Sequence, residues 1–355
     1  MNHPVRPEPA VLLRHAQDEW QSLRQRRIRL GRRRAREVTA LEKKLGLATR
    51  DAYGQALLEL GRKDPRIIVL DGDLSSSTRT ALFAKEFPSR FLNVGISEAN
   101  LVGMAGGLAR SGKIPVISSF ACFMTCKAYD QLRMAVALPH LNVKVVVSHG
   151  GISVGEDGVS QQSIEDIALM TSLPGFVVSV PADEHATRAL VKAALEIEGP
   201  VYLRTGRPKA PLVHKPSDSF SFGKGVLLRE GKDVLLVANG LMVFEALAAA
   251  KELAAAGVSA AVVDMHTVKP LDERLLVEQA RRTGAVVTAE EHQIWGGLGS
   301  AVSRALAQHH PVPMELVAIQ DTYAESGKPE ELFEKYGLTA RHIVEAVRRV
   351  LKRKR

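Results

Sequence analysis

Several polar and aromatic side chains come just after predicted buried strands. They are, with the strand that each follows, Asp71 and Asp73 (67–70), Phe120 and Phe123 (114–118), His149 (143–148), and Arg204 and Arg207 (the strand in PVYLRTG). In an open parallel α/β sheet, ligands bind beyond the carboxyl ends of the strands, so we expect these side chains to share one edge. Such a set suits proton transfer and the binding of a polar or phosphorylated small molecule.

Two other stretches carry candidate groups. NVGISEANLVGMAGGLA places a single acid, Glu98, at the start of an otherwise apolar helix, where an ionisable group needs an explanation. HGGISVGEDGVSQQ, residues 149–162, contains four glycines and presents acids, amides and hydroxyls suited to a hydroxyl-rich ligand. This loop matches neither a P-loop nor a dinucleotide fingerprint.

Each candidate also has a structural interpretation. An Asp after a strand can be a helix cap or turn former, a Phe pair can be core, and a single His can be a hydrogen-bonded structural residue. GGLG at 296–299 could hold an anion on backbone N–H groups, although we favour a close-packing turn. We find no nucleophile motif, and the two cysteines, Cys122 and Cys126, are too few for a disulfide framework and predict no metal site.

The elements that must position these residues alternate along the chain. Short apolar runs alternate with amphipathic stretches over residues 47–208, and the alternation resumes at residue 223. This pattern is typical of a parallel sheet covered by helices on both faces. We therefore predict an α/β protein with domains at 47–208 and 223–355, the second smaller, joined by a Pro- and Ser-rich linker at 209–222.

Composition and charge narrow the class of protein. Of 355 residues, 45% are hydrophobic and 25% charged, as in a globular protein, and no apolar run approaches the ~20 residues of a membrane helix. The N-terminus lacks a secretory signal, so we expect a cytoplasmic protein without membrane contact. Most of the net charge of +9 lies in residues 1–46, with 12 Lys and Arg against 5 Asp and Glu. We interpret 1–46 as a basic, partly helical arm that is solvated or packs on a partner chain; its few aromatic residues argue against nucleic-acid binding.

At GISEANLVGMAGGLA the sequence resembles the pyrimidine-binding domain of transketolases, a thiamine diphosphate family. The resemblance continues through SFACF, HGGISVGEDGVSQQSIEDIALM, VPAD and YLRTGRP, and then through TVKPLD, EEHQIWGGLGSAV and DTYAESG. It covers approximately residues 47–350, in the order of the C-terminal half of a transketolase. It implies a pyrimidine-binding α/β domain followed by a transketolase C-terminal domain.

The resemblance implies a cofactor site. Glu98 corresponds to the catalytic acid that hydrogen-bonds N1′ of the thiamine diphosphate aminopyrimidine. Phe120 and Phe123 correspond to the aromatic residues that pack on that ring, and Asp73 to an acid that lines the cofactor and substrate cleft. An apolar pocket favours the protonated form of a carboxyl group, which can then hold or share a proton with the ring.

The resemblance also implies a substrate site. His149, also a catalytic candidate, and Asp157 correspond to residues that contact the sugar hydroxyls and the phosphate end of the substrate. Arg207 corresponds to the phosphate-binding arginine, because a guanidinium can hold two phosphate oxygens, with Arg204 as the alternative. Gln161 stands where many transketolases have His, and Cys126 where many have Tyr. A Gln can bind a hydroxyl but cannot titrate, so the usual donor specificity is in question.

The family holds the diphosphate and its Mg²⁺ or Ca²⁺ on a different domain, through a G-D-G motif followed further along by Asn. DGD at 71–73 and EDG at 156–158 lack that context, so we expect no metal ligands here. The resemblance therefore implies the C-terminal subunit of a split transketolase, inactive without a separate diphosphate-binding subunit. We expect an α2β2 assembly, self-association through both domains, and a role for residues 1–46 in docking the partner.

The predicted activity is transfer of a two-carbon ketol unit from a ketose phosphate to an aldose phosphate, in the pentose phosphate pathway. One alternative is a subunit of a related thiamine enzyme: a deoxyxylulose-phosphate synthase-like protein, a 2-oxoacid dehydrogenase β-type protein, or a transketolase for an unusual sugar. Another is a non-catalytic scaffold or nucleic-acid-binding protein that uses the basic arm. The combination of Glu98, Phe120 and Phe123 argues against the last.

Overall fold

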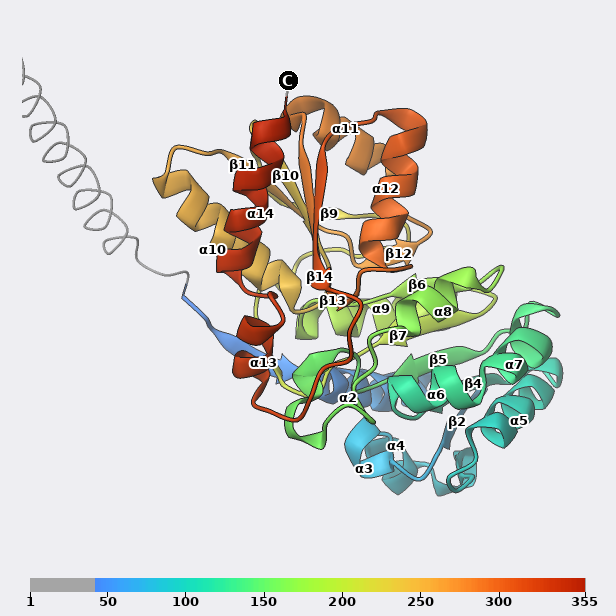
Figure 1. Cartoon of the computed structure of the whole chain (residues 1–355). Helices are drawn as coiled ribbons and strands as arrows, with labels where there is room; N and C mark the ends of the chain where they lie inside the picture. The colour runs from blue at the N-terminus through green and yellow to red at the C-terminus, as the bar shows by residue number, and fades with distance from the viewer. Residues whose placement is uncertain (1–41, 355) are drawn as a thin grey trace, which may run out of the picture.

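Short runs of Val, Ile and Leu build a seven-stranded sheet in the first of two stacked α/β domains (Figure 1). In spatial order its strands are β12 (Thr267–Lys269), β6 (Val177–Ser179), β7 (Val201–Arg204), β5 (Lys144–Val147), β4 (Ile114–Ser118), β2 (Ile67–Asp71) and β3 (Phe91–Asn93). All neighbours are parallel except β12, which is antiparallel to β6. The computed structural model describes residues 42–354, so the predicted arm lies outside the described residues except for 42–46.

Helices cover both faces of this sheet, as the strand–helix alternation predicts. One face carries α2 (Thr49–Lys63), α4 (Ala81–Glu86) and α9 (Glu184–Glu196). The other carries α5 (Glu98–Arg110), α6 (Ala121–Lys127), α7 (Tyr129–Gln131), the π-helix η2 (Leu132–Ala137) and α8 (Asp166–Ser172). The short helical segments α3 (Ser75–Thr78), η1 (Pro88–Arg90) and η3 (Ile152–Asp157) lie in connecting loops.

The second domain repeats this plan on a smaller scale. Its sheet has the order β14 (Met314–Ile319), β13 (Val286–Gln293), β10 (Val234–Ala238), β11 (Ala260–Asp264) and β9 (Val226–Arg229). The helices α10 (Met242–Ala255) and α14 (Ala340–Arg353) pack together on one face, α11 (Glu273–Thr283) and α12 (Leu298–His309) on the other, and α13 (Pro329–Lys335) lies against η3. No helix within 42–354 has the length and hydrophobicity to cross a membrane. The predicted two-domain α/β fold is confirmed.

The two domains share structure in two places. β12 belongs to the second half of the chain but completes the edge of the first-domain sheet beside β6, which the sequence did not predict because TVK is short and follows a strand of the other sheet. Lys209–Pro211, in the segment predicted as linker, forms β8, which pairs with β1 (Leu45–Ala48) as a separate two-stranded sheet. One hydrophobic cluster joins Val180 of the first domain to Val237 and Val263 of the second.

Buried polar side chains of both domains hydrogen-bond to the segment that follows β8. Asp183 Oδ2 accepts hydrogen bonds of 2.9 Å from the backbone N–H groups of Val213 and His214. His214 Nε2 lies 2.8 Å from Asp264 Oδ2, and neither side chain is exposed. Burial lowers the pKa of His214, but the hydrogen bond and charge of Asp264 outweigh that effect and hold this pKa above its ordinary value. The pairing therefore favours an imidazolium between the domains.

Asp264→Asn should lower the free energy of unfolding by about 1.5–3 kcal/mol near pH 6, the value of one hydrogen bond to a charged group, because Asp218 remains 3.5 Å from Nδ1 of the buried imidazolium. The pKa of His214 is raised in the folded state, so the pair stabilises fully below the unfolded histidine pKa and loses its effect as pH rises through the folded pKa. Chemical denaturation should therefore show a smaller difference between wild type and variant at about pH 9. An equal difference at both pH values would contradict the pairing.

Candidate active site

The strands that precede the candidate residues are neighbours in the first-domain sheet. β7, β5, β4 and β2 lie side by side and run parallel, so their carboxyl ends face one edge. This edge carries Asp71 at the end of β2 with Asp73 beyond it, Phe120 after β4, His149 after β5, and Arg207 after β7. Residues from four separate parts of the sequence thus lie on the same edge.

Glu98 is the first residue of α5, and only 3% of it is exposed. Its Oε2 lies 3.5 Å from Nζ of Lys127, at the end of α6. Its Oε1 is buried and has no hydrogen-bond partner among the described residues. Leaving a buried acceptor unpaired is costly, so Glu98 presents an acceptor for a donor from outside the described chain.

Two phenylalanines and a histidine stack near this carboxyl group. The ring centroid of Phe120 lies 5.5 Å from that of Phe123 and 3.7 Å from that of His149, with an interplanar angle of 21° in both pairs. Lys127 Nζ is 4.4 Å from the Phe123 ring centroid, so the same lysine contacts Glu98 and the aromatic stack. Phe120 is buried, whereas Phe123 is half-buried and leaves part of its ring available to another flat ring.

His149 is held as a neutral imidazole. The residue is 2% exposed, its backbone has a left-handed φ of 61°, and its Nδ1 lies 2.8 Å from Ser148 Oγ. Burial lowers the pKa of His149 to about 3, helped by the positive charges of Arg50, Arg207 and Arg79. At neutral pH the ring can therefore donate one hydrogen bond and accept another, but it does not supply a charge.

Three arginines act on this site, and the sequence analysis identified only Arg207. Arg50, in the first turn of α2, donates through Nη1 to the carbonyl of Ser77 at 3.1 Å, and its buried Nε has no hydrogen-bond partner among the described residues. Burial and then the charge of Arg79 lower the pKa of Arg50, while Arg79 pairs with Asp51 at 2.5 Å. A cation in the first turn of a helix opposes the helix dipole, and this was the available sequence signal for Arg50.

Arg207 and Asp157 meet at the mouth of the site. Arg207 Nη1 lies 3.0 Å from the carbonyl of Val154 and 3.1 Å from Glu156 Oε2, and its Nε is 3.8 Å from Asp157 Oδ2. Asp157 in turn lies 3.9 Å from His149 Nε2. The side chains of Arg207 and Asp157 are 34% and 36% exposed, so both remain accessible to a ligand.

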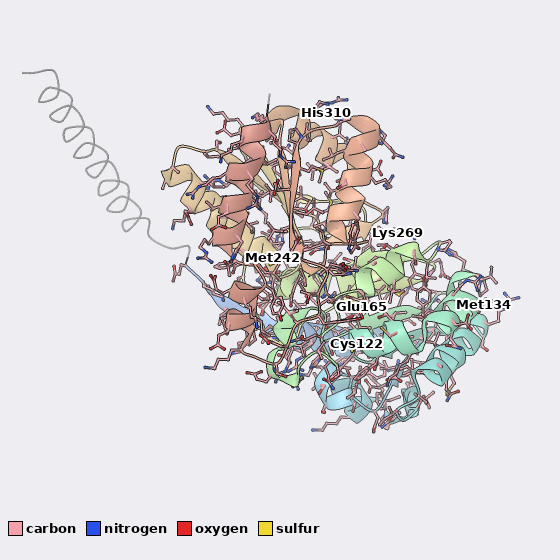
Figure 2. All side chains as sticks on the ribbon, in the orientation of Figure 1. Cys122, Met134, Glu165, Met242, Lys269 and His310 are labelled. Carbon is pink, nitrogen blue, oxygen red and sulfur yellow. The ribbon has the colours of Figure 1, made fainter. Side chains whose placement is uncertain are left out.

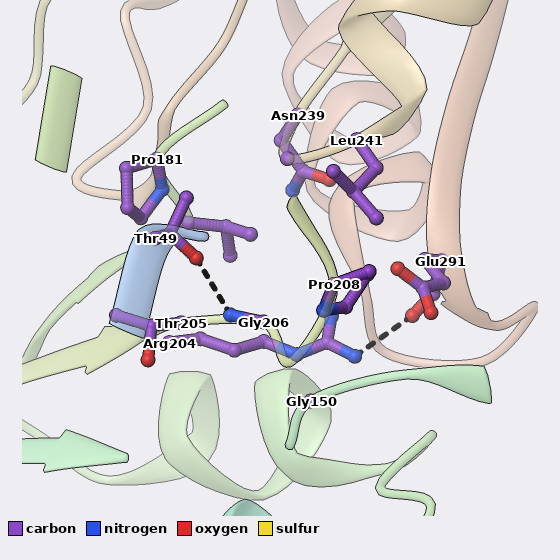
Figure 3. Close-up of a pocket in the computed structure, with 12 residues that line it drawn as sticks. Thr49, Gly150, Pro181, Arg204, Thr205, Gly206, Pro208, Asn239, Leu241 and Glu291 are labelled. Atoms are coloured by element: carbon purple, nitrogen blue, oxygen red, sulfur yellow. Dashed lines mark hydrogen bonds between the residues drawn. The ribbon is translucent and has the colours of Figure 1, made fainter. Parts of the chain in front are cut away.

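Arg204, the alternative to Arg207, is instead an interior residue. It is 4% exposed, and its Nε lies 3.3 Å from Asp166 Oδ2. It helps to line a pocket of about 30 Å³ between the domains, opposite Glu291 and Asn239 of the second domain (Figure 3). Sites for small molecules have volumes of about 300–1,000 Å³, so this pocket is too small for a sugar phosphate.

The two predicted aspartates after β2 differ in the same way. Asp71 is fully buried and accepts hydrogen bonds from the hydroxyls of Thr78 and Thr80 at 2.7 and 2.8 Å, so it orders the following loop. Asp73 is exposed, has a left-handed φ of 66°, and accepts a 2.8 Å hydrogen bond from Asn93 Nδ2. Only Asp73 is therefore open to a ligand.

The two departures from the family pattern adjoin the aromatic stack. Gln161 Oε1 accepts a 2.6 Å hydrogen bond from Ser160 Oγ, and Cys122 Sγ lies 3.4 Å from the Gln161 carbonyl. Cys126 is exposed, and its Sγ lies 3.8 Å from Glu165 Oε1. Cys122, on the same helix, also lies near Glu165, below the second domain in Figure 2. Burial raises the pKa of both thiols, that of Cys122 to about 12, so both are protonated at neutral pH. Within 42–354, no group of three His, Cys, Asp or Glu side chains could hold a metal ion.

The GGLG turn at 296–299 binds an anion that the chain itself supplies. Glu290 accepts hydrogen bonds from the backbone N–H groups of Leu298 and Gly299 at 2.7 and 2.8 Å, at the start of α12. A Cβ at Gly297 would lie 2.1 Å from Glu290 Oε2, so glycine is required for this approach. The turn is therefore a close-packed helix cap.

Both domains match models of known protein families. The family model "Transketolase, pyrimidine binding domain" matches residues 46–212, and "Transketolase, C-terminal domain" matches residues 223–343. The chain is 44% identical to the SqwH subunit of a 6-deoxy-6-sulfo-D-fructose transketolase from Clostridium sp., over 86% of this chain and 95% of the relative. It is 43% identical to a putative transketolase C-terminal section of Methanocaldococcus jannaschii, over 86% and 96%.

Solved structures agree with this placement. A split-gene transketolase in an inactive beta4 tetramer is 54% identical, with a TM-score of 0.82 over 87% of this chain and all of that chain. Campylobacter jejuni transketolase is 26% identical, with a TM-score of 0.72 over 88% of this chain and 48% of that chain. This chain therefore corresponds to about half of a single-chain transketolase, and it belongs to the transketolase family, whose members depend on thiamine diphosphate.

Proposed function

We propose that this chain is the C-terminal subunit of a split transketolase that transfers a two-carbon ketol unit between phosphorylated sugars, in the cytoplasm. The observation that carries the proposal is the buried Glu98 Oε1, which lacks a partner among the described residues and lies near a stack of aromatic rings. An aminopyrimidine offers a flat ring for the stack and a ring nitrogen for the carboxyl group. The residues therefore fit the pyrimidine half of thiamine diphosphate.

When bound, thiamine diphosphate stabilises the carbanion left after a carbon–carbon bond breaks. In our proposal Glu98 shares a proton with the aminopyrimidine, while Phe120 and Phe123 pack on the ring and orient it. Asp73 lines the cleft. The burial of Glu98 keeps water away from the carboxyl group and the ring.

The substrate roles follow from the position and charge of the remaining residues. Neutral His149 binds substrate hydroxyls through Nε2, because its Nδ1 lies 2.8 Å from Ser148 Oγ. Asp157 and Gln161 bind further hydroxyls. Arg207, joined by Arg50, binds the anionic end, because guanidinium groups hold phosphate oxygens in pairs. The SqwH relative is named for a sulfo sugar, so a sulfonate in place of the phosphate is the second candidate.

We propose that a separate subunit binds the diphosphate and its Mg²⁺ or Ca²⁺. The two relatives that match this chain almost end to end are a transketolase subunit and a C-terminal section, which supports a split enzyme. An α2β2 assembly would place the cofactor between the two kinds of chain. We also propose that the first domain ends at residue 208 and that the second begins at residue 223. Residues 1–46 would help to dock the partner subunit.

Self-association of this chain would use an uncovered face of the first domain. Gly103 and Gly107 of α5 have no neighbouring atom within 4 Å of an added Cβ, so another helix can approach closely. Met104, Met134 and Leu138 are exposed on α5 and at η2, 38%, 47% and 72% respectively. Figure 2 places Met134 at the end of the first domain away from the second domain.

Glu98→Gln should reduce ketol transfer at least about a hundredfold, because an amide cannot exchange the proton. The assay uses the full chain with its diphosphate-binding subunit and thiamine diphosphate. Glu245→Gln is the control, since Glu245 is a half-buried carboxylate of α10 that accepts a 2.8 Å hydrogen bond from Ala340 N, within the second domain. Glu98→Gln should keep the wild-type circular dichroism spectrum. Full activity in this variant would refute the proposed function.

Arg50→Gln should raise the KM for a ketose phosphate donor by about 10- to 100-fold, the value of one charge-assisted hydrogen bond. It should leave the KM for hydroxypyruvate, which has no phosphate, almost unchanged. Arg62→Gln, on the exposed end of α2 and paired with Glu86, is the control. Equal effects on both donors would argue against a site for the phosphate group at Arg50.

Xylulose 5-phosphate, fructose 6-phosphate, 6-deoxy-6-sulfofructose and pyruvate as donors would separate the candidate activities.

Met104→Glu should weaken self-association at least about tenfold, because it places a charge in an apolar helix contact. Light scattering coupled to size-exclusion chromatography at several concentrations would measure the change. Leu82→Glu is the control, since Leu82 is 41% exposed on α4, on the other face of the first-domain sheet. Equal loss of assembly in both variants, or in neither, would exclude this face as the interface.

A further inference from the structure

The loop 149–162, which carries His149 and Asp157, is shaped by the second domain. Glu291, on β13, extends its carboxyl group into the loop, where Oε1 accepts a 2.5 Å hydrogen bond from the backbone N–H of Ser153. Gly151 has a φ of 82°, and a Cβ there would lie 2.2 Å from the Glu291 carboxyl carbon. Only glycine fits, so the loop backbone closes directly around the carboxyl group.

The base of the loop rests on the same interdomain contact. Arg204 Nη2 donates to the carbonyls of Ser163 and Glu291 at 3.0 and 2.9 Å, and Gly150 packs so closely on Arg204 that a Cβ would lie 1.9 Å from Nε. Figure 3 shows Arg204 reaching to Glu291 across the boundary between the domains. Glu291 therefore acts on the loop in two ways. Its side chain accepts from Ser153 N–H, and its main-chain carbonyl accepts from Arg204, on which Gly150 packs.

The loop geometry needs such support because it includes an unfavourable backbone conformation. His149 has a left-handed φ of 61°, which is strained for a non-glycine residue and persists only where the surrounding structure holds it. The far end of the loop is also held by the second domain, where Gln162 Nε2 donates to the carbonyl of Glu325 at 3.0 Å. Glu291 is the charged group that the second domain contributes to this support.

We propose that Glu291 is a positioning residue by which the second domain fixes the backbone of loop 149–162, and with it His149 and Asp157, for the substrate. The inference rests on the proposed function, in which this loop binds the sugar. It gives the second domain an indirect part in substrate binding, since no residue of that domain contacts the sugar in the proposed site. Glu290, the neighbour of Glu291, is also buried but caps α12 instead.

The test compares Glu291→Ala, Glu291→Gln and Glu290→Ala in the complex with the diphosphate-binding subunit. Glu291→Ala should speed amide hydrogen exchange at Ser153 at least tenfold and raise the donor KM at least tenfold, with a smaller change in kcat. Glu291→Gln should stay within about threefold of wild type, because its amide oxygen can still accept from Ser153 N–H. Glu290→Ala should speed exchange at Leu298 and Gly299 but leave Ser153 and the donor KM unchanged.

If Glu291→Ala does not fold, Gly151→Ala displaces the loop from the carboxyl group without altering the second domain, and it should give the same rise in exchange and KM. Folded variants with wild-type exchange at Ser153 would overturn the inference. Faster exchange with an unchanged KM would instead overturn the proposed substrate role of the loop. The two failures are therefore distinguishable.

Discussion

The arrangement of this subunit depends on one guanidinium buried between its domains. Burial lowers the pKa of Arg204, but the charges of Asp166 and Glu291 outweigh burial and raise it overall. Asp166 is itself oriented by a 2.6 Å hydrogen bond from the Tyr202 hydroxyl. Removing one member of such a buried set leaves an uncompensated charge, at a cost of several kcal/mol. The buried Arg204 therefore links the docking of the two domains to the geometry of loop 149–162.

His149 stays neutral although three cations lie around it. Burial, and then the charges of Arg50, Arg207 and Arg79, lower the pKa of its imidazole. A positive field with a neutral hydrogen-bonding centre suits a ligand that is anionic at one end and hydroxylated along its length. Glu98 lies apart from these arginines, beside Lys127, so the acid and the anion-binding groups occupy separate parts of the edge.

Sequence reasoning located the elements better than the contacts between them. The strand-end rule placed Phe120, His149 and Arg207 on one edge because those strands are adjacent in a parallel sheet. It could not find Arg50, which comes from a helix start. It left Arg204 open as the alternative to Arg207, because an interior and a half-buried arginine lie only three positions apart. Nor could it assign the GGLG turn to Glu290, since that pairing depends on how β13 and α12 pack.

The strand β12 has a consequence for how this protein can be divided. Because β12 hydrogen-bonds to β6, separating the domains would uncover unpaired backbone groups along a parallel sheet edge. Such edges recruit other chains and promote aggregation. A chain divided near residue 212 would therefore yield two aggregation-prone fragments, so the two domains need to be made as one chain.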